Sequence, residues 1–372
     1  MKTVYKFFLG HAVLTVALLV ALITMVIVPP DLTYFDYIDF KTLFCLFATL
    51  LVVCALKNIR FFTFISRKIV HATPNLRVCI LALIYITFIG SLFIANDMAL
   101  ITFLPLGFFV LSDTGNHKYM AWVFVLQNIA ANLGGMLTPF GNPQNLYLYT
   151  KFNIPTLEFM GIMVFPFLLA VAMLSLSVLF FPKSKMSLTV SEDVIEFQPK
   201  RTAIYIILFL VSISAVFSIV HYLIATAIIV VGIFAFDKKA FSKVDYPLLL
   251  TFLMFFIFAG NMSRIGVIRD FMSTLLNKNT LLVSALSCQF ISNVPSAVLL
   301  SQFTDNYKSL LLGVNVGGTG TIIASLASLI TFSEFSRHQP ENKKKYFGIF
   351  TLLNVLFLVI LLTFCVFIEK IL

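Results

Sequence analysis

The hydrophobic pattern of the chain is a series of long apolar runs separated by short polar loops. A membrane-spanning helix requires about 20 predominantly apolar residues. Runs of that kind lie at residues 6–29, 40–57, 119–150, 156–181, 201–218, 221–236, 246–259, 307–335 and 346–369. The first run ends in Pro29-Pro30 with no cleavage-site pattern, which indicates a first membrane helix and not a signal peptide. The pattern therefore predicts an all-α polytopic membrane protein with about nine spanning helices.

Two further apolar stretches, 78–111 and 280–303, carry polar residues in the middle. The first has a turn signal at Asn96-Asp97, and the second has one at residues 292–295, Ser-Asn-Val-Pro. We expect each stretch to enter the membrane, turn and return on the same side, as a re-entrant hairpin. The alternative for 78–111 is one long span or two separate spans.

A sequence repeat relates the two halves of the chain. Residues 131–145 read ANLGGMLTPFGNPQN, and residues 314–328 read VNVGGTGTIIASLAS. At one fixed offset the matching pairs are Asn132 and Asn315, Gly134 and Gly317, Gly135 and Gly318, and Thr138 and Thr321. Ahead of each copy lies a predicted hairpin with a central asparagine, Asn96 or Asn293. The predicted topology runs the two copies in opposite directions, and such inverted repeats are typical of secondary transporters.

The repeat sets the expected domain boundaries. We predict a first inverted repeat over 1–181, a linker with an extra helix over 182–220, and a second inverted repeat over 221–372. The amphipathic segments 58–74 and 260–278 precede the two hairpins, and they suit helices that lie along the membrane surface. Ordinary loops are the alternative for these two segments.

Each repeat contains a helix that we expect to be broken. Gly-Gly lowers helix stability by about 1 kcal/mol per residue relative to Ala, and Pro139 and Pro143 block helix continuation in the first copy. We therefore predict unwound backbone near 134–145 within the first broken helix, 119–150, and a second broken helix over 307–335. Unwound backbone in a bilayer is tolerated only where it is buried in protein or lines a cavity, and its free carbonyl and N–H groups can bind ions. Alternatively, Gly-Gly serves only close helix packing.

Composition and charge agree with a membrane location and add an orientation. Of 372 residues, 60% are hydrophobic and 11% are charged. An ordinary soluble domain has roughly 25% charged residues, so this class is excluded. Most of the Lys and Arg residues fall in 1–6, 57–77, 112–118, 182–201, 237–245 and 336–345. By the positive-inside rule, these segments and the N-terminus face the cytoplasm, and we expect a multi-pass protein of the plasma, or cell inner, membrane. The net charge of +10 is thus a topology signal, and we expect the bilayer and no nucleic acid as a partner.

The sequence contains no motif for covalent or metal-assisted catalysis. It lacks GxGD, HExxH and GxSxG patterns and a phosphate-binding GxxxxGK[ST] loop. The five cysteines form no CxxC pair. We expect a transporter and not an enzyme, with no cofactor beyond a coupling sodium ion or proton.

The two hairpin motifs and the two broken helices together resemble the ion transporter superfamily. The residues that carry the resemblance are IANDMA at 94–99, NLGGMLTPFGNPQN at 132–145, ISNVPSA at 291–297 and NVGGTGT at 315–321. The superfamily includes divalent-anion/sodium symporters, citrate–metal transporters, arsenite permeases and some sodium/proton antiporters. The resemblance implies a small anionic substrate held between two hairpin tips and two unwound helices. It also implies a fixed half that often forms a homodimer and a hairpin-bearing half that moves as an elevator.

The resemblance also implies roles for particular residues. Sodium would be held by Asn96 in one half and by Asn293 in the other, together with backbone oxygens of the neighbouring broken helices. The ion-binding candidates are Asn96, Asp97, Gly134, Thr138, Asn293, Gly317 and Thr321. The substrate-binding candidates are Asn96, Asn142, Asn145, Ser292, Asn293 and Thr319. For Asn142 and Asn145, termination of a helix is an equal alternative.

Asp97 separates the candidate functions. Dicarboxylate symporters carry a Ser-Asn-Thr triplet at both tips, whereas this chain has Ala95-Asn96-Asp97 and Ser292-Asn293-Val294. A carboxylate deep in the membrane usually marks an ion or proton pathway, and the alternative is a cap on the second helix of the hairpin. We expect a secondary transporter for a small anion or oxyanion, driven by sodium or protons. The alternative is a sodium/proton antiporter or an arsenite-type efflux permease of the same superfamily.

Overall fold

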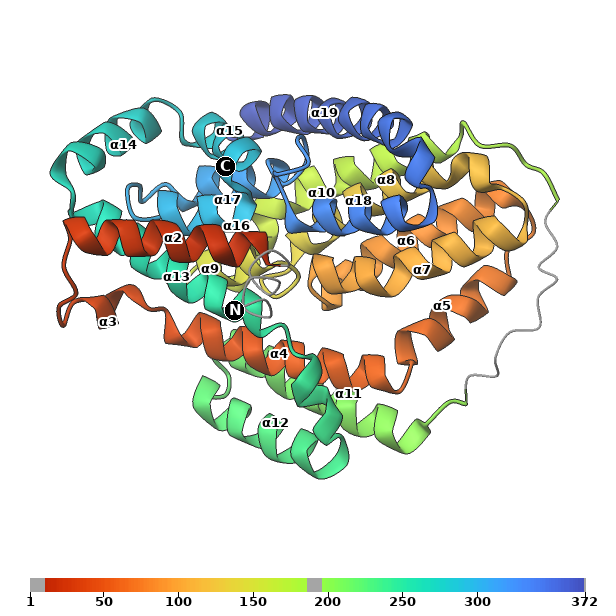
Figure 1. Ribbon diagram of the computed structural model, residues 1–372, viewed down its shortest axis with the longest axis horizontal. Coiled ribbons are helices and arrows are strands. Elements are labelled where there is room, and N and C mark those ends of the chain that lie inside the picture. The colour runs from red at the N-terminus through yellow and green to blue at the C-terminus, as the bar shows by residue number, and fades with distance from the viewer. Residues whose placement is uncertain (1–10, 186–195, 371–372) are drawn as a thin grey trace.

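The computed structural model describes residues 11–185 and 196–370, and these ranges form helices joined by short loops (Figure 1). One isolated antiparallel bridge, between Asn75 and Lys185, is the only strand-like pairing in the described ranges. The α-helices are α2 (Ala12–Ile27), α3 (Tyr34–Tyr37), α4 (Phe40–Asn58), α5 (Phe61–His71), α6 (Leu76–Phe93), α7 (Asn96–Asp113), α8 (Met120–Gly134), α9 (Pro143–Lys151), α10 (Thr156–Val178), α11 (Pro199–Val216), α12 (Tyr222–Phe236), α13 (Tyr246–Arg264), α14 (Gly266–Lys278), α15 (Thr280–Ile291), α16 (Asn293–Leu300), α17 (Tyr307–Val316), α18 (Leu326–His338) and α19 (Lys343–Ile368). The 3-10 helices are η1 (His117–Tyr119), η2 (Gly135–Leu137), η3 (Lys238–Lys243) and η4 (Pro340–Asn342).

Eight helical segments of the described chain are long and apolar enough to cross a membrane. The predicted all-α polytopic membrane protein is thereby confirmed. The segment 307–335, predicted to be a broken helix, consists of α17 and α18 separated by nine residues of irregular backbone. Two other predicted spans, α2 and α12, are helical and apolar but shorter than 18 residues. Residues 6–10 of the first predicted span lie outside the described ranges.

Some of the long helices begin where a side chain accepts a free backbone N–H. Asp39 accepts the N–H of Thr42 at the start of α4, and Asp245 accepts that of Leu248 at the start of α13. Such caps stabilise a helix by about 1 kcal/mol each. Asp39 and Asp245 therefore help to fix where α4 and α13 start.

Both predicted hairpins are present, but they differ in length. Helices α6 and α7 have 18 residues each, and they turn at Ile94 and Ala95. Helices α15 and α16 have only 12 and 8 residues, and they turn at Ser292 alone. A rise of 1.5 Å per residue makes the first pair about 27 Å long, which is close to the thickness of the hydrocarbon core. The second pair is too short to cross, whereas the length of the first leaves the two-span alternative open.

Both predicted broken helices are present. In the first, α8 and η2 end at Leu137 and α9 begins at Pro143; we call residues 138–142 the first break. In the second, α17 ends at Val316 and α18 begins at Leu326; we call residues 317–325 the second break. The first break is shorter than the predicted 134–145 because Gly134 and Gly135 keep helical dihedral angles. Helix interruption at Pro143 follows the prediction.

The same order of elements occurs twice along the chain. A long helix, an amphipathic helix, a hairpin, a broken helix and a second long helix appear first as α4 to α10 and again as α13 to α19. The predicted surface segments contain α5 and α14, so helices replace the loop alternative there. The inversion of the two sets across the bilayer stays a prediction, as do the exact domain boundaries.

Two sets of helices pack among themselves, and contacts of α13 with α16 and of α4 with α9 join the two sets (Figure 1). Helices α4, α11 and α12 pack on one another, and α2 packs along α13. The hairpins pack on the broken helices, with α6 and α7 against α8, and α15 and α16 against α17. The first group lies at the left and bottom of Figure 1, and most of the second lies at the top and right.

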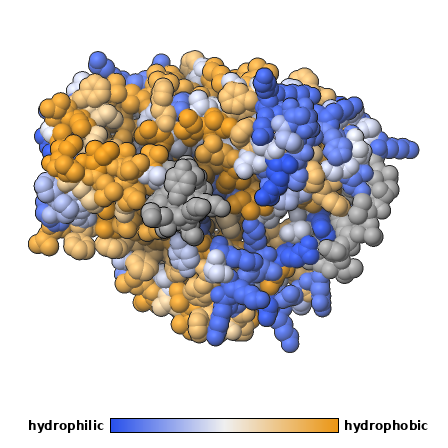
Figure 2. Space-filling view, viewed as in Figure 1, coloured by the Kyte–Doolittle hydropathy of each residue, from blue (hydrophilic) through white to orange (hydrophobic). Residues whose placement is uncertain are grey.

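The surface divides between apolar and polar regions (Figure 2). Hydrophilic residues gather mainly on the right of the view, the end at which α11 begins and α7 ends, and apolar residues cover much of the left. All five cysteines are buried and none forms a disulfide. The polar end contains several of the Lys- and Arg-rich loops, as a cytoplasmic face would.

Candidate functional site

The first hairpin tip, residues 94–97, places two polar side chains at the start of α7. Asn96 and Asp97 are 3% and 9% exposed. The Oδ1 atom of Asn96 accepts the N–H of Asp97 at 3.0 Å, within the first turn of α7. Asp97 Oδ1 is buried without a hydrogen-bond partner among the described residues. The alternative role of Asp97, as a cap of α7, is therefore not observed in the structure.

The second hairpin tip, residues 291–294, repeats this arrangement with Asn293. Its Oδ1 atom accepts the N–H of Val294 at 2.9 Å, and its own N–H donates to the carbonyl of Ala324 in the second break at 2.9 Å. Ser292 forms the turn with φ 73° and ψ 157°. That region of backbone space is nearly restricted to glycine and costs about 1–3 kcal/mol for other residues. The second tip is therefore strained and is held by its neighbours.

We expect Ser292→Gly to raise the Tm of the purified protein, because glycine relieves the strain at this turn. The Ser292 hydroxyl contributes little in return, since its contacts with the Ala324 carbonyl and Asn293 Oδ1 are both 3.4 Å long. Thermal unfolding in detergent measures the change. The matched control is Ser287→Gly within α15, where glycine costs roughly 0.5–1 kcal/mol and the Tm should fall. A lower Tm for Ser292→Gly would contradict the strain.

Asn132 of α8 joins the first tip to the second broken helix. Its Oδ1 atom accepts from Asn96 Nδ2 at 3.0 Å and from Ser325 Oγ at 2.7 Å. Its backbone carbonyl accepts from Asn142 Nδ2 at 3.2 Å. Asn132 Nδ2 remains buried without a partner in the described chain. Through its side chain and its backbone carbonyl, Asn132 therefore links the hairpin, the first break and the start of α18.

The side chain of Asn145, in α9, bonds backbone carbonyls of η2 and of the first break. Its Nδ2 atom donates to the carbonyls of Gly135, Met136 and Thr138 at 3.1, 3.3 and 3.3 Å. Its Oδ1 atom accepts from Asn315 Nδ2 at 2.6 Å, which ties the two broken helices together. Asn145 thus has both ends of its side chain engaged by the protein itself.

The side chain of Gln289, in α15, bonds backbone groups of the second break in a similar way. Its Nε2 atom donates to the carbonyls of Gly317 and Thr319 at 2.9 and 3.1 Å, and its Oε1 atom accepts the N–H of Thr321 at 2.8 Å. Gly320, with φ 117°, is required beside it, because a Cβ at that position would overlap Gln289 Oε1. The carbonyls of Gly317 and Thr319 in the second break are therefore already bonded to this side chain.

The threonines at matching repeat positions make matching bonds. Thr138 Oγ1 donates to the carbonyl of Leu92 at 3.0 Å, and Thr321 Oγ1 donates to that of Gln289 at 2.9 Å. Each acceptor lies four residues before the asparagine of its hairpin tip. Both threonines therefore attach a break to its hairpin.

The Gly-Gly pairs allow each broken helix to approach its hairpin closely. A Cβ added to Gly134 would overlap the backbone carbonyl of Phe88 in α6. A Cβ added to Gly317 would come within 2.9 Å of Ala285 Cα in α15. Close packing, the alternative role of these glycines, is therefore part of the structure, in addition to the helix breaks.

An inner cavity of about 30 Å³ lies where the two tips meet. Its polar lining comes from Asn96, Asp97, Thr251, Ser292, Asn293 and Ser325. A water molecule requires roughly 10–15 Å³, so this space accommodates only a water or two. The four elements predicted to form one site, two tips and two broken helices, do converge.

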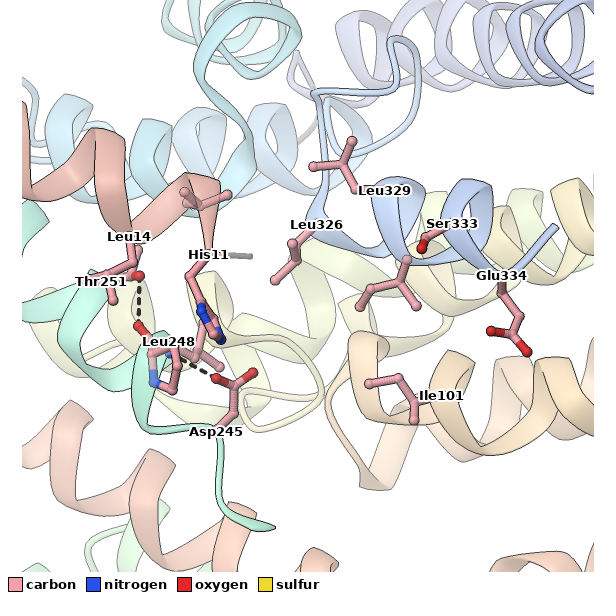
Figure 3. Close-up of a pocket in the computed structure, with 13 residues that line it drawn as sticks. His11, Leu14, Ile101, Asp245, Leu248, Thr251, Leu326, Leu329, Ser333 and Glu334 are labelled. Carbon is pink, nitrogen blue, oxygen red and sulfur yellow. Dashed lines mark hydrogen bonds between the residues drawn. The ribbon is translucent and has the colours of Figure 1, made fainter. Parts of the chain in front are cut away.

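A larger cavity of about 430 Å³, which we call the vestibule, adjoins the inner one (Figure 3). The two cavities share Val13, Leu248, Thr251 and Leu326 in their linings. In Figure 3, His11 from the start of α2 and Asp245 from the start of α13 lie on one side, and Glu334 of α18 lies on the other. The vestibule thus separates α2 and α13 from α7 and α18, and its volume falls in the range of small-molecule sites.

The charge of the vestibule lining is acidic. Asp245 and Glu334 line it, and no Lys or Arg is among its lining residues in the described chain. Asp245 Oδ1 accepts the N–H of Leu248. Glu334 lies 3.1 Å from His338 Nε2 and 3.5 Å from Arg337, so its charge is partly compensated.

The structure brings together only part of the predicted site set. Asn96, Asp97, Ser292 and Asn293 line the inner cavity, and Asn142 contacts Asn132 beside it. The other candidates are bonded or packed within the protein itself: Gly134 packs on α6, and hydrogen bonds engage Thr138, Asn145, Gly317, Thr319 and Thr321. Their ion- and substrate-binding roles stay predictions.

Sequence reasoning assigned no role to three residues that matter in this geometry: Asn132, Gln289 and Ser325. Asn132 had a usable signal, because it recurs in the repeat as Asn315. Gln289 had a weaker one, an amide in an apolar helix one turn before the tip asparagine. Ser325 had none beyond its place near the repeated motif.

The fold and the site define an integral membrane transporter, in which hairpin tips and helix breaks meet at one polar cavity. Comparison with known proteins agrees. The chain belongs to the citrate transporter family, which matches residues 7–310. It is 34% identical over 298 residues to an uncharacterized transporter of Methanocaldococcus jannaschii, covering 80% of this chain and 81% of the relative. It is 27% identical over 301 residues to the inner membrane protein YbiR of Escherichia coli, covering 79% of each chain. An uncharacterized transporter of Haemophilus influenzae is 28% identical over 183 residues, 48% of this chain and 40% of that protein.

Proposed function

We propose that the protein is a secondary active transporter that moves a small anion or oxyanion across the membrane, with sodium or protons as the driving ion. Membership of the citrate transporter family makes a small carboxylate the first candidate substrate. The observation that carries the proposal is the convergence of both hairpin tips and both broken helices on the inner cavity, next to a vestibule of ligand size. Asn132, whose Oδ1 bonds the lining residues Asn96 and Ser325, also has a buried Nδ2 without a partner in the described chain.

The proposed mechanism is an elevator. The body formed by α2, α4, α11, α12 and α13 would stay fixed, and we expect it to hold the interface of a homodimer. The hairpins and broken helices would move past it together, because hydrogen bonds tie both halves of that body at Asn132–Ser325 and Asn145–Asn315. The vestibule lies along the boundary between the two bodies.

The proposed location is the plasma, or cell inner, membrane with the N-terminus in the cytoplasm. Asp245 and Glu334 then lie near the cytoplasmic face, so the vestibule would open inward. This places the inner cavity at the deep end of a pathway from the cytoplasm. Antibody or protease access to an N-terminal tag in sealed vesicles of known orientation tests the assignment.

A second candidate function is exchange of a cation for protons, or efflux of a weak oxyacid of the arsenite type. The two carboxylates of the vestibule favour it, because the lining contains no Lys or Arg in the described chain and negative charge repels a dianion. Asp97 would then carry the exchanged proton. The two candidates differ in whether an anion stimulates ion movement.

We expect purified protein in proteoliposomes to accumulate radiolabelled citrate, or another small carboxylate or oxyanion, only when an ion gradient is imposed. The assay compares a pH gradient, a sodium gradient and no gradient, with protein-free liposomes as the control. Anion-independent sodium or proton flux would instead support the second candidate. Uptake proportional to concentration, without saturation, would exclude a carrier.

A further inference from the structure

Carbonyl groups freed at a helix break within the membrane are typical ligands for a cation. The second break follows the C-terminal end of α17, where the helix dipole also favours positive charge. In this chain a side-chain amide occupies that environment. Gln289 Nε2 donates to the carbonyls of Gly317, Thr319 and Ala285 at 2.9, 3.1 and 3.0 Å.

We propose that Gln289 takes the place of a coupling cation at the second break and thereby closes this break to sodium. Three carbonyl oxygens converge on one nitrogen that carries a partial positive charge. The other end of the same amide, Oε1, accepts the N–H of Thr321 at 2.8 Å, so the side chain is held at both ends. Sodium can enter only if these bonds break.

The backbone is adapted to the amide. Gly320 adopts φ 117°, and any Cβ there would overlap Gln289 Oε1. The segment therefore bends around the side chain and has no space for both the amide and a larger residue. The close fit between Gly320 and the Gln289 side chain is a second observation, in addition to the hydrogen bonds, that the break accommodates this amide.

The first break has an equivalent device. The residue that corresponds to Gln289 in the first hairpin is the apolar Leu92, and the amide comes instead from Asn145. Asn145 Nδ2 donates to three carbonyls of residues 135–138, as described above. At both breaks, a carboxamide side chain of the protein thus donates hydrogen bonds to freed backbone carbonyls.

The inference decides which ion, sodium or a proton, is coupled to transport. Because amide nitrogens bond the carbonyls of Gly317 and Thr319 in the second break and of Thr138 in the first, we infer that sodium is not the coupling ion. The carboxylate of Asp97, whose buried Oδ1 has no partner in the described chain, would then couple transport by binding a proton. The inference rests on the proposed function only in that it selects between its two coupling ions. It differs from the expectation of sodium held by tip asparagines and break carbonyls, which stays a prediction.

The test is a thermal-shift titration of the full-length protein in detergent with sodium chloride, against choline chloride at equal concentration. We expect the Tm of the native protein to be the same in both salts. We expect Gln289→Glu, which removes the donor and adds a carboxylate among the carbonyls, to gain a sodium-specific rise in Tm of about 3 °C near about 100 mM sodium. The matched control is Gln302→Glu at the end of α16, whose amide donates to Tyr147 Oη and which should gain no sodium response.

Sodium-specific stabilisation of the native protein would overturn the inference, and so would a folded Gln289→Glu variant that ignores sodium. The native measurement decides even if the variant fails to fold. It also needs no transport, so failure of anion uptake in proteoliposomes would remove the proposed function and leave this result standing.

Discussion

Asp97→Asn is expected to abolish accumulation driven by a pH gradient while leaving the protein folded. The two side chains have nearly the same shape, but only the carboxyl group can take up and release a proton. Asp97 lines the inner cavity, and its Oδ1 atom has no partner in the described chain. No hydrogen bond of Oδ1 is therefore lost on substitution. Uptake of the transported anion by proteoliposomes with an acidic exterior measures the effect, and we expect it to fall to the level of protein-free liposomes.

The control for this experiment is Asp39→Asn. Asp39 also lies at the start of a membrane helix, where its carboxylate accepts the N–H of Thr42 at 2.9 Å. Asparagine is an equally good helix cap, so stability and uptake should stay close to the native values. Exchange of labelled for unlabelled substrate, which needs no net proton movement, should survive in Asp97→Asn. Normal pH-driven uptake by that variant would refute Asp97 as the proton carrier.

Gly134→Ala is expected to be the most destabilising of the conservative substitutions in this protein. The added methyl group would overlap the backbone carbonyl of Phe88, and a backbone atom cannot turn aside as a flexible side chain can. Overpacking of this kind costs typically 1–3 kcal/mol, and we expect the upper end, about 3 kcal/mol. Moving α8 away from α6 would also displace Asn132, so transport should fall with stability.

Trp122, the single tryptophan of the chain, lies on α8 and reports on this region through its fluorescence. Thermal unfolding followed at Trp122 should show a clear drop in Tm for Gly134→Ala. The matched control is Gly161→Ala on α10, where an added Cβ meets no atom within 4 Å. Alanine is the better helix former there, so the Tm should stay the same or rise. Equal Tm values for the two variants would show that the α6–α8 contact is not tight.

Much of the fold was predictable because each signal was local. Apolar runs gave the spans, and the repeated Asn-x-Gly-Gly pattern gave the broken helices. Tip asparagines were predictable for a physical reason, since a short side chain that bonds the next backbone N–H can start a helix inside a membrane. The difference in length between the two hairpins was visible in the apolar pattern only as an ambiguity.

The site was less predictable than the fold, because its bonds join residues far apart in sequence. Asn132 meets Ser325 across 193 positions, and Asn145 meets Asn315 across 170. Gln289 stands in an apolar helix with no neighbour in sequence to suggest a role. Whether a carboxamide side chain can reach freed carbonyls depends on the path of the unwound backbone. The amino-acid composition does not determine that path.

The narrowness of the inner cavity bears on what an electrical recording would detect. A space of about 30 Å³ between the tips cannot pass a hydrated ion or a carboxylate without separation of the helices. Throughput is then limited by helix movement, which takes microseconds to milliseconds or longer. A bilayer that contains this protein should give no unitary current steps, and any charge it moves should appear only as a small, saturable macroscopic current.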